Sequence, residues 1–553
     1  MRYFVYLLFP VFIKALQYSD LPKVTLRQGV LEGFYKQSVE GNIIYAFEGV
    51  PYAEPPVGHL RFKDPQPPKP WQGIWKANTM FTCMQLYHYT PQGQDMVTGD
   101  EDCLYMNIYT PDLNPTEKMD VLVYIHGGAF MFNKGGNQGP EFIIDKKIVY
   151  VNFNYRLGPL GFLSTEDDLV PGNMGLKDQQ MVLKWIKMNI HHFGGNPDSV
   201  TIVGNSAGGA SVQLHFLTPG SAGLFHKGYS QSGCALNGWA LVENPLEKAL
   251  KLANLTGCPT DEVEETVDCL RSRPGKQIVA AVKNFQPWLY NPFTVFGPVV
   301  DIWAPSPFIP DHPYTLLKEK KVQDLPWMIS YVSGEGLYPG SDFYDEEKLE
   351  YLEDNWNDLL PYILHYMDVI ESENREHIGQ KIRAQYLGNE SLNKETYNRL
   401  IQAMTDRLFI ADIEKAGKLH SAATSSPVYS YFFNYRGAHS KTEMRINSNE
   451  NIGVSHTDDN AYMFKTNLVD TMSTEADRNM TEIMVQILVG FVKNGRPEVS
   501  TDWKPLYKNV DEPWRQLRIE SPGKLILEEK DEIGNNAFWD SLGFQENENV
   551  CEM

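Results

Sequence analysis

Val200-Thr201-Ile202-Val203-Gly204-Asn205-Ser206-Ala207-Gly208 is the stretch that decides the fold of this 553-residue chain. Its first four residues are β-branched and predict a strand, and the run 209–217 that follows can form a helix. The two flanking glycines allow the sharp strand-to-helix turn that lifts a serine hydroxyl clear of the backbone. A bare G-x-S-x-G pattern is common by chance, but the strand before it and the helix after it predict that Ser206 is a nucleophile.

Apolar runs and helical stretches alternate on both sides of this turn. We predict strands at residues 121–125, 148–154, 200–203, 327–332 and 428–433. Leu176, Leu183, Ile186 and Ile190 recur at helical spacing between two of them. This alternation predicts an α/β fold with a mostly parallel central sheet, helices on both faces, and ligands beyond the carboxyl ends of the strands. Residues 342–398 are charged and helical in pattern, and we expect them to form an insertion or cap beside the sheet.

A glycine pair follows the predicted strand 121–125, in His126-Gly127-Gly128-Ala129-Phe130. Without side chains, the backbone there lets N–H groups approach a developing oxyanion. We predict that the amides of Gly127, Gly128 and Ala207 form an oxyanion hole, each donor contributing about 3 kcal/mol of transition-state stabilisation. The pair alone is equally compatible with an ordinary turn, but the serine turn downstream favours the oxyanion hole.

The composition is that of a globular protein with a large core, since 42% of the residues are hydrophobic and 12% are aromatic. No Pro/Ser-rich linker or charge block divides the chain, so we expect a single domain over residues 18–545. A net charge of -21 and a pI near 5.1 disfavour nucleic acid and anionic membranes as partners. No histidine or cysteine cluster indicates a metal site, and we expect no cofactor. The sequence carries no signal for the oligomeric state of the protein.

The two ends of the chain predict export. Arg2, an apolar run over residues 3–13 and then Ala15 are typical of a signal peptide, which we place approximately at residues 1–17. The run is too short to span a bilayer, and the alternative of a buried N-terminal strand fits an unbroken apolar opening less well. Residues 546–553 form a polar tail with neither a lipid-anchor signal nor a retention signal. We therefore expect a secreted protein without a membrane anchor.

Six cysteines suit an oxidising compartment without forming a disulfide-dense scaffold. Two pairs would each close a short loop, Cys83 with Cys103 and Cys258 with Cys269, whereas Cys234 and Cys551 have no obvious mate. The glycosylation sequons lie at Asn254, Asn389 and Asn479 and agree with secretion.

Several longer motifs resemble the type-B carboxylesterase and cholinesterase family, along nearly the whole chain after the signal. They are Phe47-Glu48-Gly49-Val50-Pro51-Tyr52-Ala53, Pro55-Pro56-Val57-Gly58, Glu101-Asp102-Cys103-Leu104-Tyr105-Met106-Asn107, Asn152-Phe153-Asn154-Tyr155-Arg156-Leu157-Gly158, Phe193-Gly194-Gly195-Asn196-Pro197 and Ser230-Gln231-Ser232-Gly233. The run His456-Thr457-Asp458-Asp459 resembles insect carboxylesterases more than cholinesterases proper.

The resemblance implies the α/β-hydrolase fold and a Ser-Glu-His triad. It places the acid on Glu335, in Ser333-Gly334-Glu335-Gly336, and the base on His456, which gives the chain order expected of that fold. His456 would take the Ser206 proton and return it to the leaving alcohol, while Glu335 would fix the imidazole tautomer. Ser232 matches a family serine near the acid that would supply a supporting hydrogen bond; a plain core serine is the alternative.

The same resemblance implies scaffold bonds. It pairs Cys83 with Cys103 and Cys258 with Cys269, and it implies the ion pairs Arg61–Glu101 and Arg156–Asp178.

The substrate signals argue against a choline ester. Cholinesterases carry a tryptophan in the loop of the first cysteine pair, whereas this loop has only Tyr87 and Tyr89 as aromatics, and Asn205 stands where those enzymes have glutamate. Juvenile-hormone esterases commonly have glutamine before the serine, so that assignment is not favoured either. The acyl-side segment, residues 291–297, mixes small and aromatic residues. We expect a small apolar ester as partner, of xenobiotic, pheromone or odorant, hormone or lipid-derived origin.

Two alternatives stay open at this point. A non-catalytic adhesion or binding protein can share the fold, but such members usually have a broken triad and a transmembrane segment, unlike this chain. An esterase that sequesters ester toxins through slow deacylation would use the same residues. The sequence therefore favours a catalytic serine esterase that acts through an acyl-enzyme.

Overall fold

The computed structural model describes residues 20–89, 96–499 and 502–546, and an 11-stranded sheet forms its centre. From one edge to the other the strands are β16 (Lys524–Lys530), β15 (Trp514–Ser521), β14 (Val428–Phe433), β13 (Trp327–Val332), β12 (Lys227–Gln231), β11 (Gly195–Asn205), β9 (Met119–Ile125), β10 (Val149–Phe153), β8 (Tyr105–Thr110), β4 (Ile43–Pro51) and β3 (Phe34–Gln37). The strands from β15 to β10 are all parallel, and the pairs outside them are antiparallel. The predicted mostly parallel sheet is therefore confirmed.

All five predicted strands are present, as β9, β10, β11, β13 and β14. The parallel strand β12 has the sequence Lys-Gly-Tyr-Ser-Gln, which carries no apolar run, and so the sequence pattern did not indicate it. Small sheets outside the central one pair β1 (Lys23–Leu26) with β2 (Gly29–Glu32), β2 with β5 (Ile74–Lys76), and β6 (Gln85–Leu86) with β7 (Val97–Thr98).

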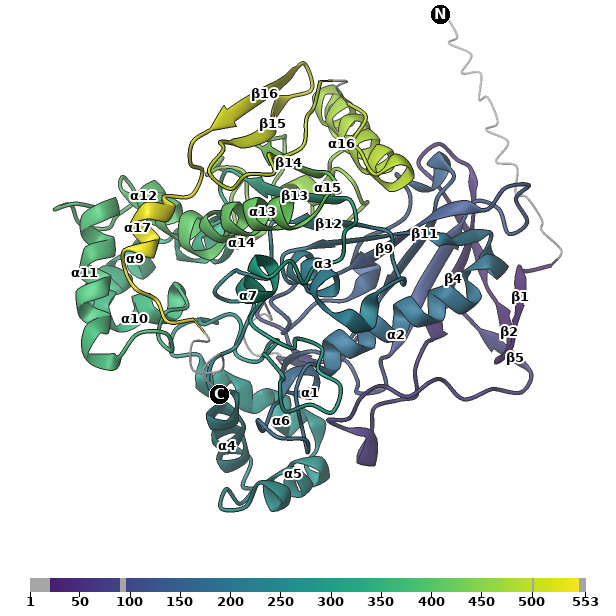
Figure 1. The fold of residues 1–553 in the computed structure, drawn as a ribbon, viewed down its shortest axis with the longest axis horizontal. Helices are drawn as coiled ribbons and strands as arrows, with labels where there is room; N and C mark the ends of the chain where they lie inside the picture. Colours follow the sequence, from purple (N-terminus) through teal and green to yellow (C-terminus); the bar gives the residue numbers. More distant parts are fainter. Residues whose placement is uncertain (1–19, 90–95, 500–501, 547–553) are drawn as a thin grey trace, which may run out of the picture.

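Helices cover both faces of the sheet because its central strands alternate apolar residues to both sides (Figure 1). In β9, Val121, Val123 and Ile125 pack with α2 (Met174–Asn189), α3 (Ala207–Leu217) and α13 (Ala411–Ala423). Leu122 and Tyr124 point to the other face and pack with α16 (Glu475–Asn494). Strands buried on both faces are the expected state of a parallel sheet.

Two further groups of helices lie beside the sheet (Figure 1). The first comprises α9 (Glu346–Asp354), α10 (Trp356–Ile363), α11 (Arg375–Tyr386) and α12 (Tyr397–Thr405), so residues 342–398 are largely helical as expected. The second comprises α4 (Pro245–Leu255), α5 (Val263–Ser272) and α6 (Gly275–Ala281). The short helices are α1 (Gly158–Phe162), α7 (Pro313–Lys318), α8 (Leu337–Gly340), α14 (Glu443–Ile446), α15 (Asp458–Ala461) and α17 (Asn536–Asp540).

Covalent and ionic bonds tie the loops to this scaffold. Disulfides join Cys83 to Cys103 and Cys258 to Cys269, and Cys234 is buried as a free thiol. The Arg61 guanidinium meets the Glu101 carboxylate at 2.5 Å, and Arg156 meets Asp178 at 2.7 Å with both side chains buried. Paired, hydrogen-bonded charges are the form in which ionised groups are tolerated in a core.

The surface features bear on the predicted export. Asn254, Asn389 and Asn479 are all exposed, as glycan acceptors must be. Within the described ranges, no helix combines the length and apolar character needed to cross a bilayer. The predicted signal peptide at residues 1–17 lies outside the described residues, as does the predicted tail except for Glu546, which forms an ion pair with Arg407.

Candidate active site

Ser206 stands at the tip of the turn between β11 and α3, at the carboxyl edge of the parallel strands. Its backbone angles are φ 57° and ψ -125°, a conformation that side chains adopt only under strain. Its N–H donates to the Gln231 carbonyl at 2.7 Å, and its own carbonyl accepts from Ala210 at 2.9 Å. The strained turn is therefore held from both sides, and the serine stays 6% exposed.

The glycines around the serine are there because no side chain fits. A Cβ on Gly204 would lie 2.3 Å from the Gly208 carbonyl oxygen, and one on Gly208 would lie 2.1 Å from the Ile125 carbonyl oxygen. Gly233 is equally tight, since its Cβ would lie 2.2 Å from the Ser206 carbonyl oxygen. These contacts involve backbone atoms, which cannot move aside without displacing β9 or the turn itself.

Glu335 and His456, 121 residues apart, form one buried hydrogen bond. His456 Nδ1 lies 2.5 Å from Glu335 Oε2, and the two residues are 5% and 0% exposed. The other carboxylate oxygen, Oε1, accepts the Val332 N–H at 2.8 Å, which fixes the carboxylate plane just after β13. A carboxylate accepts, so Nδ1 carries the proton and Nε2 of the neutral ring is the basic nitrogen.

The loops that carry the acid and the histidine run side by side. Gly334 pairs with Ser455 as a parallel bridge, and the Gly334 N–H donates to the Val454 carbonyl at 3.0 Å. This backbone contact places Glu335 next to His456, which explains how residues from distant segments meet.

Aromatic rings enclose the histidine. The Phe409 ring, in the π-helical turn Asp406–Ile410, lies 4.6 Å from the His456 ring, and the Tyr338 ring stacks on it at 5.4 Å. His456 Nε2 is buried and has no hydrogen-bond partner among the described residues. Nε2 thus lies in an apolar environment, and its lone pair is free to accept a proton.

The segment that follows His456 is bonded to the residues that hold the serine. Asn460 in α15 donates from Nδ2 to the Gln231 side-chain oxygen at 3.0 Å and to the Tyr124 hydroxyl at 3.2 Å. Gln231 is also the residue whose carbonyl accepts the Ser206 N–H. The serine turn and the histidine segment are therefore connected through Gln231.

The predicted oxyanion donors differ in their hydrogen bonding. The Gly127 N–H donates to Asn205 Oδ1 at 3.3 Å, whereas the N–H groups of Gly128 and Ala207 have no acceptor among the described hydrogen bonds. The Ala129 N–H is also without an acceptor there, and this residue has a φ of 54°. Ala129 was not among the predicted donors, although its position directly after the glycine pair was visible in the sequence.

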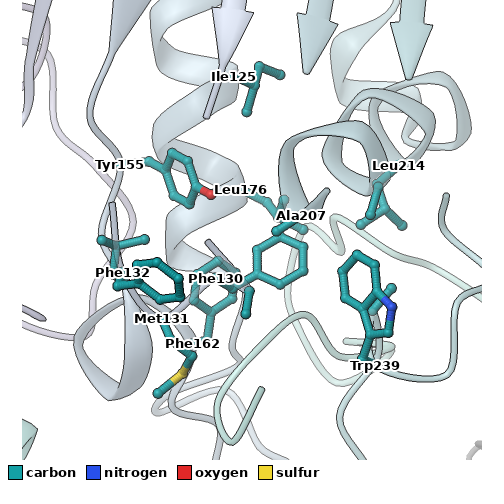
Figure 2. Close-up of a cluster of buried hydrophobic side chains, with 14 of the residues drawn as sticks. Ile125, Phe130, Met131, Phe132, Tyr155, Phe162, Leu176, Ala207, Leu214 and Trp239 are labelled. Atoms are coloured by element: carbon teal, nitrogen blue, oxygen red, sulfur yellow. The ribbon is translucent and has the colours of Figure 1, made fainter. Parts of the chain in front are cut away.

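His126 and the core below shape this glycine loop. His126 is fully buried, and burial lowers its pKa to about 4, so the ring is neutral at pH 7. Since a carbonyl only accepts, His126 Nδ1–H donates to the Gly127 oxygen, at 2.7 Å, and the ring stacks on Tyr155 at 4.4 Å. Figure 2 shows Phe130, Met131 and Phe132 of the same loop gathered in the core near Tyr155 and Ala207.

Ser232 does not form the expected bond to the acid. It is fully buried with a φ of 50°, and its N–H donates to the Ser330 carbonyl at 2.8 Å. Its hydroxyl Oγ has no hydrogen-bond partner among the described residues. Glu335 Oε1 is instead satisfied by the backbone of Val332, which leaves Ser232 with a backbone role in the structure.

Beyond the rings around His456 lies a cavity of about 240 Å³. Trp239, Thr294 and Val295 line it, two of them from the predicted acyl-side segment. The Trp239 ring lies 5.9 Å from Phe409 and 6.1 Å from Phe293. Trp239 thus stands between this cavity and the ring that contacts the histidine. No local pattern marked Trp239, Phe409 or Tyr338, since each belongs to a different segment and gains its place only from the fold.

The groups gathered at the site suit chemistry at a serine hydroxyl. No group of histidine, cysteine, aspartate and glutamate side chains in the described ranges could hold a metal ion. A hydroxyl on a strained turn, an imidazole oriented by a carboxylate, and unpaired backbone donors are the parts that acyl transfer to serine requires.

Comparisons with known proteins show the family of the chain. The model of the carboxylesterase family matches residues 20–539. Venom carboxylesterase-6 of Apis mellifera is 41% identical over 98% of both chains, and esterase E4 of Myzus persicae is 40% identical over 91% of this chain and 92% of its own.

A solved structure supports the fold at the level of the whole chain. The crystal structure of juvenile hormone esterase from Manduca sexta is similar with a TM-score of 0.81 and 26% identity, over 95% of this chain and 99% of that one. The fold is the α/β-hydrolase fold, and the activity is that of a carboxylic ester hydrolase. Sequence, sheet order and relatives lead to one conclusion: this chain belongs to the carboxylesterase family.

Proposed function

We propose that the protein hydrolyses a small apolar ester through an acyl-enzyme on Ser206. In the first step Ser206 Oγ forms a bond to the ester carbonyl carbon while His456 Nε2 takes the hydroxyl proton. The carbonyl oxygen becomes an oxyanion, and His456 then gives the proton to the leaving alcohol as the carbon–oxygen ester bond breaks. Water repeats the sequence on the acyl-enzyme and releases the carboxylic acid.

Glu335 and the backbone amides supply the electrostatics of this reaction. Glu335 keeps the Nδ1–H tautomer and stabilises the imidazolium that forms when Nε2 takes the proton. Among the predicted donors, Gly128 and Ala207 have free N–H groups for the oxyanion, and Ala129 adds a third. Gly127, whose N–H already donates to Asn205, acts on the oxyanion only as a shared donor or through the shape of the loop.

The observation that carries the proposal is the hydrogen bond between His456 Nδ1 and Glu335 Oε2 at 2.5 Å. A buried carboxylate that is bonded to an imidazole by Nδ1, and leaves Nε2 unpaired, is the arrangement that activates a serine. Among the buried histidines with an unpaired Nε2, His456 is distinguished by the carboxylate bonded to its other ring nitrogen, since His126 Nδ1 bonds a backbone carbonyl instead.

The apolar character of the substrate follows from the residues around the histidine. Phe409, Tyr338 and Phe293 are packed ring against ring, and Trp239 adds a further wall. Such walls favour an aliphatic or aromatic acyl group over a charged one. Relatives of this chain carry names that include a venom carboxylesterase and a juvenile hormone esterase, and hormone, pheromone or odorant, xenobiotic and lipid-derived esters all fit the class.

Secretion is part of the proposal. It is supported by the apolar N-terminal run in the sequence, by the two disulfides, and by the exposure of all three sequon asparagines. Secretion of the protein from insect cells, with a lower mass after glycosidase treatment, would support it.

Hydrolysis of a p-nitrophenyl ester series from acetate to decanoate tests the proposal. We expect turnover by the wild type and a loss of about 10³-fold or more in Ser206→Ala. The matched control is Ser211→Ala, since Ser211 is a buried serine of the same helix whose hydroxyl donates to the Ala207 carbonyl at 2.8 Å. This control should keep its activity.

The outcomes separate the alternatives. Equal activity in Ser206→Ala would exclude Ser206 as the nucleophile. A stoichiometric burst of p-nitrophenol followed by very slow turnover would indicate a sequestering esterase, and no burst with no turnover would indicate a binding protein.

A further inference from the structure

Asn205, the last residue of β11, is buried next to the nucleophile and bonds across to the glycine loop. Its Oδ1 accepts the Gly127 N–H at 3.3 Å and the hydroxyl of Tyr124. The side chain is 6% exposed and Tyr124 is fully buried. A buried amide oxygen with two donors is a fixed point between two otherwise separate segments.

The orientation of the Asn205 amide follows from its partners. The Gly127 N–H can only donate, so the side-chain atom that faces it must be the oxygen and not the nitrogen. On its other side, the Gly127 carbonyl accepts the Nδ1–H of His126 at 2.7 Å. The N–H and the carbonyl of Gly127 are thus held by Asn205 and His126, and the direction in which the next amides point is set by these two bonds.

Asn205 is itself held by a network that reaches the rest of the site. The Tyr124 hydroxyl accepts from Asn460 Nδ2 at 3.2 Å, and Asn460 also donates to the Gln231 side chain at 3.0 Å. Gln231 in turn accepts the Ser206 N–H through its backbone carbonyl at 2.7 Å. Asn205 Oδ1 is therefore linked by hydrogen bonds, through Tyr124, Asn460 and Gln231, to both the histidine segment and the serine turn.

Asn205 also carries no charge, which distinguishes it from the glutamate that cholinesterases have at this position. A carboxylate of the same shape would accept the same two hydrogen bonds but would add a negative charge one residue from Ser206. The oxyanion that develops at Ser206 is negative as well, and like charges close together in a buried site repel strongly. An amide supplies the acceptor without that repulsion.

We propose that Asn205 is a positioning residue for the oxyanion hole, acting through the Gly127 amide to aim the free N–H groups of Gly128 and Ala129 at the oxygen that forms on the ester. The inference rests on the proposed acyl transfer at Ser206. Its consequence is specific to the transition state, because the ground-state ester carries no oxyanion.

The test compares Asn205→Leu, which keeps the shape but removes the acceptor, with the wild type. We measure kcat and KM for p-nitrophenyl acetate, and the inhibition constant of an alkyl trifluoromethyl ketone. That ketone adds the serine Oγ to its carbonyl carbon, its oxygen becomes an oxyanion, and the serine proton passes to His456. If the N–H groups of the oxyanion hole are misoriented, kcat should fall about 10- to 100-fold and the inhibition constant of the ketone should rise by a similar factor. KM should stay within about threefold of the wild-type value.

Asn205→Asp separates the acceptor from the charge. It keeps both hydrogen bonds, so the melting temperature should stay closer to the wild type than that of Asn205→Leu, while the added charge lowers kcat and ketone affinity together. If Asn205→Asp keeps full kcat, neutrality is not required and that part of the proposal fails.

Asn107→Leu is the matched control. Asn107 is a buried asparagine of β8 whose Oδ1 likewise accepts a glycine N–H, that of Gly49 at 3.0 Å, and whose Nδ2 donates to Asn152. Its loss should lower the melting temperature but leave kcat and the ketone constant unchanged. An Asn205→Leu protein that behaves in the same way, stable or not, would overturn the positioning role. Turnover that survives in Ser206→Ala would instead refute the proposed function itself.

Discussion

A single carboxylate orients the imidazole of His456, the proposed base. Glu335 accepts a hydrogen bond from His456 Nδ1–H with one carboxylate oxygen and from the Val332 N–H with the other. No other bond in the described site orients the ring, since the remaining neighbours of His456 are the rings of Phe409 and Tyr338. The tautomer therefore depends on the charge and acceptor character of this one side chain.

Replacing Glu335 by glutamine should separate geometry from charge. Glu335→Gln can still accept from Val332, but its amide nitrogen donates toward Nδ1 and favours the tautomer in which Nε2 carries the proton. We expect kcat for p-nitrophenyl acetate to fall about 10³- to 10⁴-fold with little change in melting temperature.

Asp301→Asn is the control for this prediction. Asp301 is another fully buried acid that accepts two backbone N–H groups, from Phe308 and Ile309. Its amide variant should retain activity. A Glu335→Gln enzyme within about tenfold of the wild type would exclude Glu335 as the triad acid.

Position 208, two residues after Ser206, has no room for a side chain. A Cβ at Gly208 would lie 2.1 Å from the carbonyl oxygen of Ile125, the last residue of β9. We expect Gly208→Ala to destabilise the fold by about 3 kcal/mol or more, because the clash is with backbone that cannot repack. Thermal unfolding measures the loss, with Gly523→Ala as the control, since a Cβ there meets nothing within 4 Å. Equal melting temperatures of the two variants would contradict the geometry of the turn.

At the scale of elements, the site is assembled where parallel strands end. β9 leads into the glycine loop, β11 into Ser206 and β13 into Glu335. The sequence predicted this edge correctly, because buried parallel strands leave apolar runs such as Trp327–Val332 that can be recognised without a structure. The sequence did not indicate β12, because this strand has no apolar run. It is stabilised by its pairing with β11 on one side and with β13 on the other.

The walls of the site could not be predicted in the same way. Phe409 comes from a π-helical turn and Tyr338 from the short helix α8, and both are ordinary aromatic residues in sequence. What makes them neighbours of His456 is the packing of α8 against α12 and of α13 on the sheet, a long-range property. The motif residues could be predicted because the local backbone at those positions accepts only particular side chains. The residues that line the site need only be bulky and apolar, so no local pattern marks them.

The short helix α15 carries a buried acid that makes stability depend on pH. Burial, with the neighbouring Glu335 charge, raises the pKa of Asp459 to about 6 although Tyr431 donates to it at 2.6 Å. In the unfolded chain the pKa is about 4. The folded state therefore holds the proton more tightly, and this stabilising contribution is complete below pH 4 and lost as the pH rises through 6.

Asp459→Asn should remove this dependence. The variant should be more stable than the wild type at pH 7, by about 3 kcal/mol at most, and the difference should vanish toward pH 4. Urea unfolding at both pH values measures it. A difference that is constant between pH 4 and pH 7 would show that Asp459 does not titrate in this range.

At the scale of the molecule, a cavity lies between the loop around Trp239, helix α4 and the segment that follows α10. Trp239 stands between the ring of Phe409 and a cavity of about 240 Å³ lined by Val242 and Val295. We expect the size of this tryptophan to limit how far an acyl chain can extend from the serine.

Trp239→Ala should open the catalytic space into that cavity. We expect the ratio of kcat/KM for decanoate to that for acetate to rise about tenfold or more, since each additional buried methylene contributes about 0.8 kcal/mol. The acetate value in the same variant is the internal control for folding. An unchanged ratio would mean that the acyl chain leaves the site in another direction.

The central claim is that a covalent acyl-enzyme forms on Ser206. Its most direct test is peptide mapping by mass spectrometry after reaction of the folded protein with a fluorophosphonate, which transfers its phosphonyl group to an activated serine and releases fluoride. The account predicts one adduct per chain, on Ser206, and none in the Glu335→Gln or His456→Ala protein on the same time scale. An adduct on another residue, or rapid labelling of Ser206 without His456, would contradict it.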